Sequence, residues 1–228
     1  MSSDELRRQS QIRMLPQEHV DYLHKLKKVY GFSPRVVYDI GSNLLHWTNE
    51  ARAVWPDSTY VLFDATDSLE FLYQENAFTY HMGVLSNISG REVTFYQNDM
   101  STGGNSYYRE NEMFNPDASF LYDDSKSRKL TAMTLDDVVS SRQFPSPTLV
   151  KIDVQGAELD IIRGAQLTLA NCTHLIVELR YLEYNLGAPE ASEIIEFLEE
   201  IGFISVGKFC SNEFDADFHF INTNHIQH

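Results

Sequence analysis

A lysine and an aspartate interrupt an apolar strand pattern in LVKIDVQGAELDIIRGA, residues 149–165, and their types and spacing indicate chemistry. Alternation along a strand places Lys151 and Asp153 on one face, with apolar side chains on the other. Asp153 falls at the carboxyl end of the strand, where parallel sheets bind ligands, and Gly156 then opens a turn into a helix. We therefore expect Asp153 at the mouth of a crevice, as a general base or a ligand of a divalent metal.

Lys151 needs a partner, because an isolated ammonium group buried in a sheet is costly. Glu178, in the next strand pattern HLIVELR, is the expected partner. The pair could be a structural ion pair that fixes the register of two strands, or it could assist Asp153 in catalysis.

A second ligand signal lies in VVYDIGSN, where a short apolar strand ends at Asp39 and Gly41 follows. The next acidic strand end is Asp64, at a spacing typical of a carboxylate that binds a ribose. The sequence has neither a G-x-G-x-x-G motif nor a phosphate-binding loop, which argues against NAD and ATP. A nucleoside ligand without phosphates, S-adenosylmethionine, fits better.

The elements that must position these residues form strands that alternate with helices. This pattern predicts one α/β domain over residues 1–228, built on a parallel sheet with helices on both faces. Expected strands cover 36–40, 59–65, 78–85, 148–154, 174–180, 203–209 and 217–222, and expected helices cover 44–55, 67–76, 157–170 and 189–201. Residues 1–34 form an N-terminal helical cap, within which residues 1–15 are expected to be frayed.

A polar insertion over residues 86–130 breaks the alternation after the third strand, and we expect it to shape the acceptor site. Its hydroxyl, amide and aromatic groups suit a sugar. The residues expected to face the crevice are Ser101, Asn105, Ser106 and Tyr107. Tyr107 and Tyr108 could equally form the contact of a homodimer.

The net charge of −15 disfavours a nucleic-acid or anionic-membrane partner, since both are polyanions. Two cysteines, Cys172 and Cys210, make neither a disulfide framework nor a zinc motif. The N-terminus shows no secretory signal, and no run of apolar residues is long enough for a membrane span. We therefore expect a cytoplasmic protein.

Taken together, VVYDIGSN, VLFDAT, TLDDVV, LVKIDVQGAELDIIRGA and HLIVELR resemble the FkbM family of S-adenosylmethionine-dependent methyltransferases, over about residues 36–222. The resemblance implies a class I methyltransferase fold, Rossmann-like, with seven strands in the order 3-2-1-4-5-7-6 and the last strand antiparallel. It also implies O-methylation, often of sugar hydroxyls in glycans or natural products.

Carried over residue by residue, the resemblance assigns a cofactor site. It comprises Asp39, Gly41, Ser42 and Asn43 in the loop, Asp64 after the second strand, and Asp153 beside the methyl group. Ala65, Gly83 and Val84, at the C-terminal ends of the second and third expected strands, are expected to line the same pocket.

Two positions depart from the family pattern. Leu45 stands where the cofactor loop of the family usually has a second glycine, which could reshape the pocket or abolish cofactor binding. Gln155 stands where glutamate is common, which keeps hydrogen bonding but argues against a metal ligand at this position.

Glu178 and His219 are candidate helpers of Asp153, although a hydrogen-bonded structural histidine explains His219 as well. His46 and His81 lie near the expected cofactor side, while His225 and His228 belong to a terminal tail without an expected role.

Two rival functions stay open at this point. One is a non-catalytic nucleoside-binding module that kept the fold, which the change at Leu45 would explain. The other is an NAD-dependent oxidoreductase, which the missing dinucleotide motif argues against.

Overall fold

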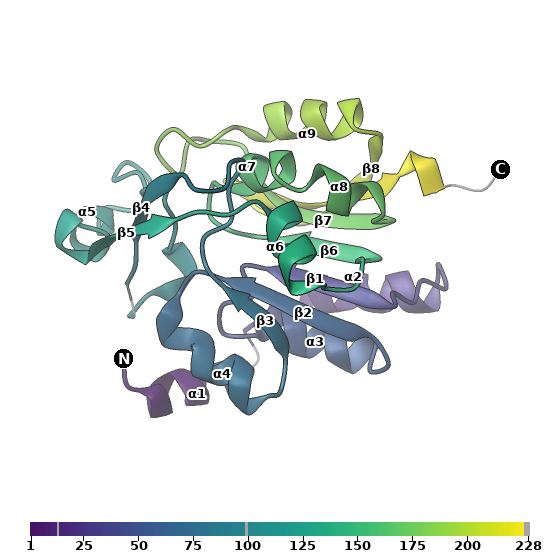
Figure 1. Ribbon diagram of the computed structural model, residues 1–228, viewed down its shortest axis with the longest axis horizontal. Coiled ribbons are helices and arrows are strands. Elements are labelled where there is room, and N and C mark those ends of the chain that lie inside the picture. Colours follow the sequence, from purple (N-terminus) through teal and green to yellow (C-terminus); the bar gives the residue numbers. More distant parts are fainter. Residues whose placement is uncertain (13, 99, 226–228) are drawn as a thin grey trace.

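The computed structural model describes residues 1–12, 14–98 and 100–225, and a seven-stranded sheet in the order β3-β2-β1-β6-β7-β9-β8 forms its centre (Figure 1). The strands are β1 (Val36–Ile40), β2 (Thr59–Asp64), β3 (Thr79–Met82), β6 (Leu149–Ile152), β7 (His174–Arg180), β8 (Phe203–Ser211) and β9 (Asp215–Asn222). The last strand, β9, runs antiparallel to both β7 and β8, and the other pairs are parallel. This is the predicted order, since β6, β7, β8 and β9 are the fourth to seventh strands of this sheet.

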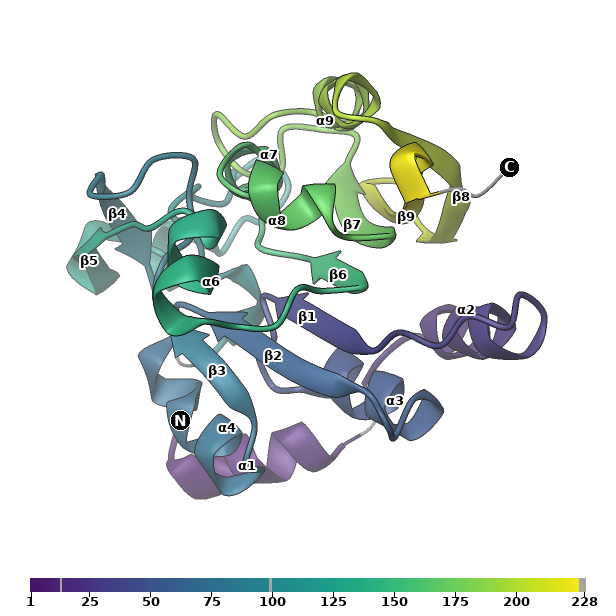
Figure 2. The same ribbon diagram turned by 45° about the vertical axis from the view of Figure 1, so that its right-hand side comes forward.

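Helices cover both faces of the sheet, which confirms the three-layer architecture (Figure 2). On one face, apolar side chains of α6 (Leu135–Arg142), α7 (Glu158–Arg163), α8 (Gln166–Ala170) and α9 (Ala191–Glu200) pack in one core cluster with the strands. On the other face, α1 (Ser3–Gln11), α2 (Gln17–Lys28), α3 (His46–Val54) and α4 (Glu70–Glu75) belong to a second cluster. The helix predicted over 157–170 is divided into α7 and α8 at Gly164.

The N-terminal residues are more ordered than predicted. The expectation of a frayed segment is wrong for α1, whose Leu6 is buried in the second core cluster. The guanidinium group of Arg7 donates two hydrogen bonds to Glu75 of α4, at 2.7 and 3.0 Å. Burial of one leucine and this paired contact hold the helix against the body of the protein.

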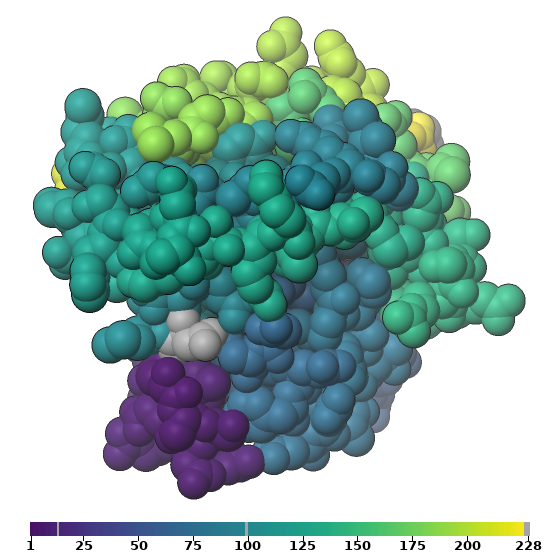
Figure 3. Space-filling model, turned by 60° about the vertical axis from the view of Figure 1, so that its left-hand side comes forward, coloured from purple at the N-terminus to yellow at the C-terminus, as the bar shows by residue number. Residues whose placement is uncertain are grey.

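The insertion forms a small structure of its own beside the main sheet. Its strands β4 (Glu92–Tyr96) and β5 (Ser127–Thr131) pair antiparallel, and the short helices η2 (Thr102–Gly104), α5 (Ala118–Leu121) and η3 (Asp124–Lys126) lie between them. Figure 3 shows the insertion, in teal, on the same face of the molecule as the purple N-terminal residues. Two further one-turn helices, η1 (Asp67–Leu69) and η4 (Thr223–His225), complete the chain.

Strand register decides which charged residues meet. Asp39 on β1 lies beside Lys151 on β6, and Glu178 on β7 lies opposite Asp217 on β9. All four stand toward the carboxyl ends of the parallel strands, where such sheets bind ligands. Among the helices in the part of the chain that the structure describes, none is both long and apolar enough to cross a bilayer.

Candidate functional site

A cavity of about 440 Å³ opens at the carboxyl ends of the central strands. Its wall combines the loop after β1, the ends of β2 and β6, the segment after β3, and part of the insertion. The predicted site residues that line it are Gly41, Ser42, Asn43, Asp64, Ala65, Gly83, Val84, Asn105, Ser106, Tyr107, Lys151, Asp153 and Glu178. The sheet topology thus brings together most of the residues that the motifs singled out.

The loop after β1 requires glycine at its first position. Gly41 has φ +83°, and a Cβ atom there would lie 1.8 Å from the backbone oxygen of Asp153. Its N–H group donates a hydrogen bond of 2.9 Å to the Phe63 carbonyl. The loop therefore passes tightly between β2 and the end of β6, which only a residue without a side chain permits.

Leu45 has a backbone conformation that favours glycine. Its φ of +65° is in the left-handed region, at the N-cap of α3. Its side chain is buried in the core cluster with Leu6 and Leu72, and it lines a small separate cavity instead of the main one. The Leu45 side chain therefore does not enter the main cavity.

Asp64 connects the two loops at this end of the sheet. Its carboxylate oxygens accept hydrogen bonds of 2.8 Å from the backbone N–H groups of Asn43 and Thr66. Burial raises the pKa of Asp64, and these two bonds offset the rise in part. Each carboxylate oxygen can accept a further bond, so Asp64 can still receive a ribose hydroxyl.

Asp39 is the exception among the predicted cofactor residues, because it lies beneath the cavity and is not among the residues that line it. Its carboxylate accepts a hydrogen bond from the Thr48 hydroxyl. Its other oxygen, Oδ1, is 3.9 Å from Lys151 Nζ. Burial raises the pKa of Asp39, and Lys151 counters this rise. The structure corrects the predicted cofactor contact to a supporting role under Lys151.

The expected ion pair between Lys151 and Glu178 is wrong. Lys151 Nζ lies 3.0 Å from Asp153 Oδ2, and the strand register sets Lys151 beside Ile176, two residues before Glu178. Burial would lower the pKa of Lys151, but Asp153 and Asp39 raise it. Burial would likewise raise the pKa of Asp153, yet Lys151 holds it below its usual value. Both groups therefore keep their charges at neutral pH.

Glu178 belongs to a different network, centred on Gln155. The Gln155 amide donates to Asp153 Oδ1 at 2.9 Å and to Glu178 Oε2 at 3.2 Å, and its oxygen accepts from Arg180. Arg180 also donates to Glu178 at 3.2 Å. A glutamate at 155 would add a third negative charge between two carboxylates, so the amide suits this position.

The environments of the two carboxylates move their pKa values in opposite directions. Burial, and then the negative charge of Asp153, raise the pKa of Glu178 well above its ordinary value, and Arg180 counters them only in part. The pKa of Asp153 is lowered. Such a divergence typically separates a group that accepts a proton from one that stays ionised.

The insertion brings three of its four predicted residues to the cavity. Asn105 donates to Thr66 at 3.1 Å, and the Ser106 hydroxyl accepts from the Tyr108 N–H at 3.1 Å. Ser101 is exposed and does not line the cavity, so its predicted substrate contact is not realised. Tyr107 also lines the cavity, and its hydroxyl donates to Asp160 at 3.0 Å.

His219 is not brought to the cavity. Its Nδ1 is 2.8 Å from the Tyr22 hydroxyl and its Nε2 is 2.8 Å from His174 Nδ1, so both ring nitrogens have partners inside the protein. Burial, with the neighbouring His174, lowers the pKa of His219 to about 3. The catalytic role predicted for His219 is therefore replaced by the structural one.

The remaining predicted histidines differ in their surroundings. His46 lines the cavity, and burial lowers its pKa. Burial also lowers the pKa of His81, which does not line the cavity. His225 is exposed and bonds to the Ala170 carbonyl, and His228 lies outside the described residues.

The sequence motifs did not reveal the wall that the two chain ends provide. Met14, Leu15, Pro16 and His19 line the cavity from the N-terminal side, and Cys210, Asn212, Asp215 and Asp217 line it from the β8–β9 hairpin. These two groups of residues are about two hundred positions apart in the sequence. A motif of neighbouring residues cannot indicate that they are close in space, so only the fold shows it. The possible metal ligand Asp153 already has Lys151 as its cationic partner.

The strand order and the antiparallel β9, with the cavity at the strand ends, define a class I methyltransferase fold. The chain belongs to the family described as the methyltransferase FkbM domain, whose model matches residues 19–205. A comparison with curated proteins gave no match.

Solved structures with a similar fold differ greatly in sequence. An O-methyltransferase family protein from Burkholderia thailandensis is 9% identical with a TM-score of 0.50, and the match covers 96% of this chain and 57% of that one. A precorrin-6y C5,15-methyltransferase from Geobacter metallireducens GS-15 is 15% identical over 90% and 87% of the chains, with a TM-score of 0.49. A SAM-dependent methyltransferase from Aquifex aeolicus is 10% identical over 98% and 100%, with a TM-score of 0.48. At these identities the likeness concerns the fold.

Proposed function

We propose that this methyltransferase uses S-adenosylmethionine to methylate a hydroxyl group, that of a sugar in a glycan or a glycosylated small molecule. The observation that carries the proposal is the pair Asp153 and Glu178. They line one cavity, share the Gln155 amide, and have pKa values displaced in opposite directions. Methylation of a hydroxyl oxygen releases a proton, and a carboxylate with a raised pKa can accept it.

The residues present fit the cofactor. The cavity volume of about 440 Å³ falls in the range of small-ligand sites. Asp64 at the end of β2 can accept ribose hydroxyls, and Gly41 lets the loop after β1 pass close to the Asp153 backbone, which brings this loop to the cavity wall. S-adenosylmethionine carries a methyl group on a positively charged sulfur, and its transfer to oxygen breaks the carbon–sulfur bond and leaves a neutral thioether.

The protein groups then have distinct roles in the proposal. Glu178, whose raised pKa suits a base that works near neutral pH, accepts the proton of the acceptor hydroxyl. Asp153 stays ionised beside Lys151 and favours positive charge at its side of the cavity. Gln155 and Arg180 orient the Glu178 carboxylate. This revises the first prediction, in which Asp153 was the base or a metal ligand and Glu178 its helper.

The acceptor class is inferred from the wall that the insertion provides. Asn105 and Ser106 present an amide and a hydroxyl, and the half-buried Tyr107 presents a ring. Polar forks beside an aromatic face are the usual means of holding a sugar, whose ring has hydroxyl edges and apolar faces. The negative net charge of the chain supports a neutral or cationic acceptor over a nucleic acid.

The test is methyl transfer from labelled S-adenosylmethionine to a panel of sugars and glycosides, read by mass spectrometry. Glu178→Gln should lower turnover by roughly 10²–10⁴-fold while calorimetry shows unchanged cofactor affinity. Binding of the cofactor without transfer to any hydroxyl would contradict O-methylation. Failure to bind either S-adenosylmethionine or its demethylated product would favour the alternative, a non-catalytic module with this fold.

A further inference from the structure

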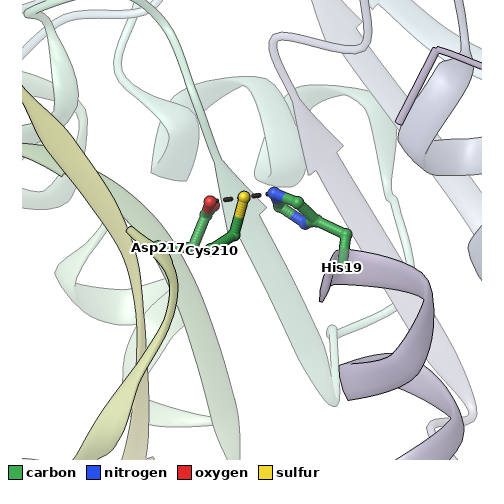
Figure 4. Close-up of side chains that lie close together, drawn as sticks. All are labelled: His19, Cys210 and Asp217. Carbon is green, nitrogen blue, oxygen red and sulfur yellow. Dashed lines mark ion pairs between the residues drawn. The ribbon is translucent and has the colours of Figure 1, made fainter. Parts of the chain in front are cut away.

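Three side chains with metal-binding atoms meet at the edge of the cavity (Figure 4). They are His19 in the first turn of α2, Cys210 near the end of β8, and Asp217 on β9. One imidazole nitrogen, the thiol sulfur and one carboxylate oxygen all lie within 4.8 Å of one another. His19 Nε2 is 2.8 Å from Asp217 Oδ2. Three different donor atoms from separate segments therefore converge on one point.

A β-bulge explains why Cys210 reaches this cluster. In the β8–β9 hairpin, Phe209 is opposite Asp217 and Ser211 is opposite Ala216, so Cys210 is the extra residue between two register pairs. Its φ is +47°. A bulge redirects a side chain that regular alternation would turn to the other face. The neighbouring Phe209 also points toward His19, with 5.2 Å between the centroids of the two rings.

The surroundings suit a bound ion. His19 and Asp217 are 7% and 5% exposed, and His19 Nδ1 has no hydrogen-bond partner within the described residues. Cys210 is half-buried. All three residues line the cavity, so an ion bound by them would be accessible from the interior of the cavity. Glu178, opposite Asp217 in the strand register, stands close to this side.

We propose that His19, Cys210 and Asp217 bind a divalent transition metal, Zn²⁺. Hard cations such as Mg²⁺ and Ca²⁺ prefer oxygen ligands alone, whereas a thiolate with an imidazole and a carboxylate selects zinc. Zinc ligands at about 2.0–2.3 Å in a tetrahedron stand roughly 3.4 Å apart, which the cluster reaches with small side-chain movements. Three protein ligands and one open position are the arrangement of catalytic zinc sites.

The open position gives the metal a second consequence, which rests on the proposed function. A hydroxyl group bound there would have a lowered pKa and would lose its proton more readily to Glu178. Metal binding itself needs no methyl transfer, so it can be tested separately from the proposed function.

The experiment measures metal binding to the whole chain after treatment with a chelator. Calorimetry with Zn²⁺ should show one site per chain. The affinity for Zn²⁺ should fall by at least roughly 10–100-fold in each of three variants, His19→Gln, Cys210→Ser and Asp217→Asn. That range is the loss seen when only an outer-shell partner of a metal site is removed. Cobalt in place of zinc should give a thiolate charge-transfer band that Cys210→Ser lacks.

Matched controls lie elsewhere in the chain. Cys172→Ser changes a cysteine in the core, and His225→Gln changes an exposed histidine. Both should bind Zn²⁺ as the wild type does. Absence of saturable binding to the wild type, or equal binding to the three cluster variants, would overturn the proposal. Should Asp217→Asn fail to fold by circular dichroism, Cys210→Ser, near the surface, decides alone.

Discussion

Lys151 and Asp153 form an ion pair at the cavity, with Nζ 3.0 Å from Oδ2, although the two residues are only two positions apart. Lys151 is 4% exposed, and its second carboxylate, Asp39, is 3.9 Å away and fully buried. One ammonium group therefore serves two acidic residues, one beneath the cavity and one in its wall. Removal of the lysine leaves both acids without their cation.

We expect Lys151→Met to lower the free energy of unfolding by about 3–5 kcal/mol, because breaking a buried ion pair leaves uncompensated charge. Urea unfolding at pH 7 followed by circular dichroism measures the change. Lys208→Met, at an exposed lysine on β8, is the control and should change stability by less than about 0.5 kcal/mol. Equal losses in the two variants would show that the pair contributes nothing specific.

The pH dependence of methyl transfer should report Glu178. Since the proposed base works only when deprotonated, kcat/KM should rise with pH, with a midpoint well above the ordinary glutamate pKa of 4.5. Arg180 lowers the pKa of Glu178, so Arg180→Gln should move the midpoint to still higher pH. Glu196→Gln, at an exposed glutamate of α9, should leave the profile unchanged. A downward movement in Arg180→Gln would remove Glu178 from the proton transfer.

Asp64 should control cofactor affinity more than turnover. Asp64→Ala removes the proposed ribose acceptor together with the bonds to the Asn43 and Thr66 N–H groups. We expect a loss of ~1–3 kcal/mol in the binding of S-adenosylmethionine, measured by calorimetry. Asp67→Asn, at a neighbouring exposed residue paired with Arg128, serves as the matched change. The ribose contact lies elsewhere if both variants bind as tightly as the wild type.

Leu45 permits a test in which glycine should be better tolerated than alanine. Either substitution removes a buried leucine side chain, at a cost of about 2–5 kcal/mol. Glycine regains roughly 1–2 kcal/mol at this left-handed position, and alanine does not. Leu45→Gly should therefore be the more stable variant in urea, with cofactor affinity unchanged, because the side chain does not line the main cavity. A more stable Leu45→Ala would contradict the assigned backbone conformation.

The fold and half of the site follow from signals that are local in the sequence. Asp64 and Asp153 each end an apolar strand, and Gly41 follows one directly, so their meeting at one sheet edge could be predicted. The partner of Lys151 could not be predicted in this way. The register of β6 and β7 places Lys151 beside Ile176, two residues before Glu178, and the sequence alone does not show this register. His19 was also missed, since its approach to the sheet depends on the packing of α2 against β8.

His219 yields the last prediction, which concerns stability at acidic pH. The fold lowers the pKa of His219 from 6.5 to about 3, chiefly through burial and then through His174. A lowered pKa means that the folded state favours the neutral imidazole. This contribution is complete above pH 6.5 and is lost as the pH falls toward 3, because the unfolded chain takes up the proton first. The melting temperature of the wild type should therefore fall between pH 6.5 and 4.

His219→Gln removes the titrating ring, so its melting temperature should fall less over the same interval, even though the loss of the bonds to Tyr22 and His174 makes it less stable at pH 7. His225→Gln, at an exposed histidine, should follow the wild type at every pH. Differential scanning calorimetry at intervals of half a pH unit compares the three slopes. Parallel curves for wild type and His219→Gln would mean that the buried histidine pair does not resist protonation, and that other groups cause the acid sensitivity.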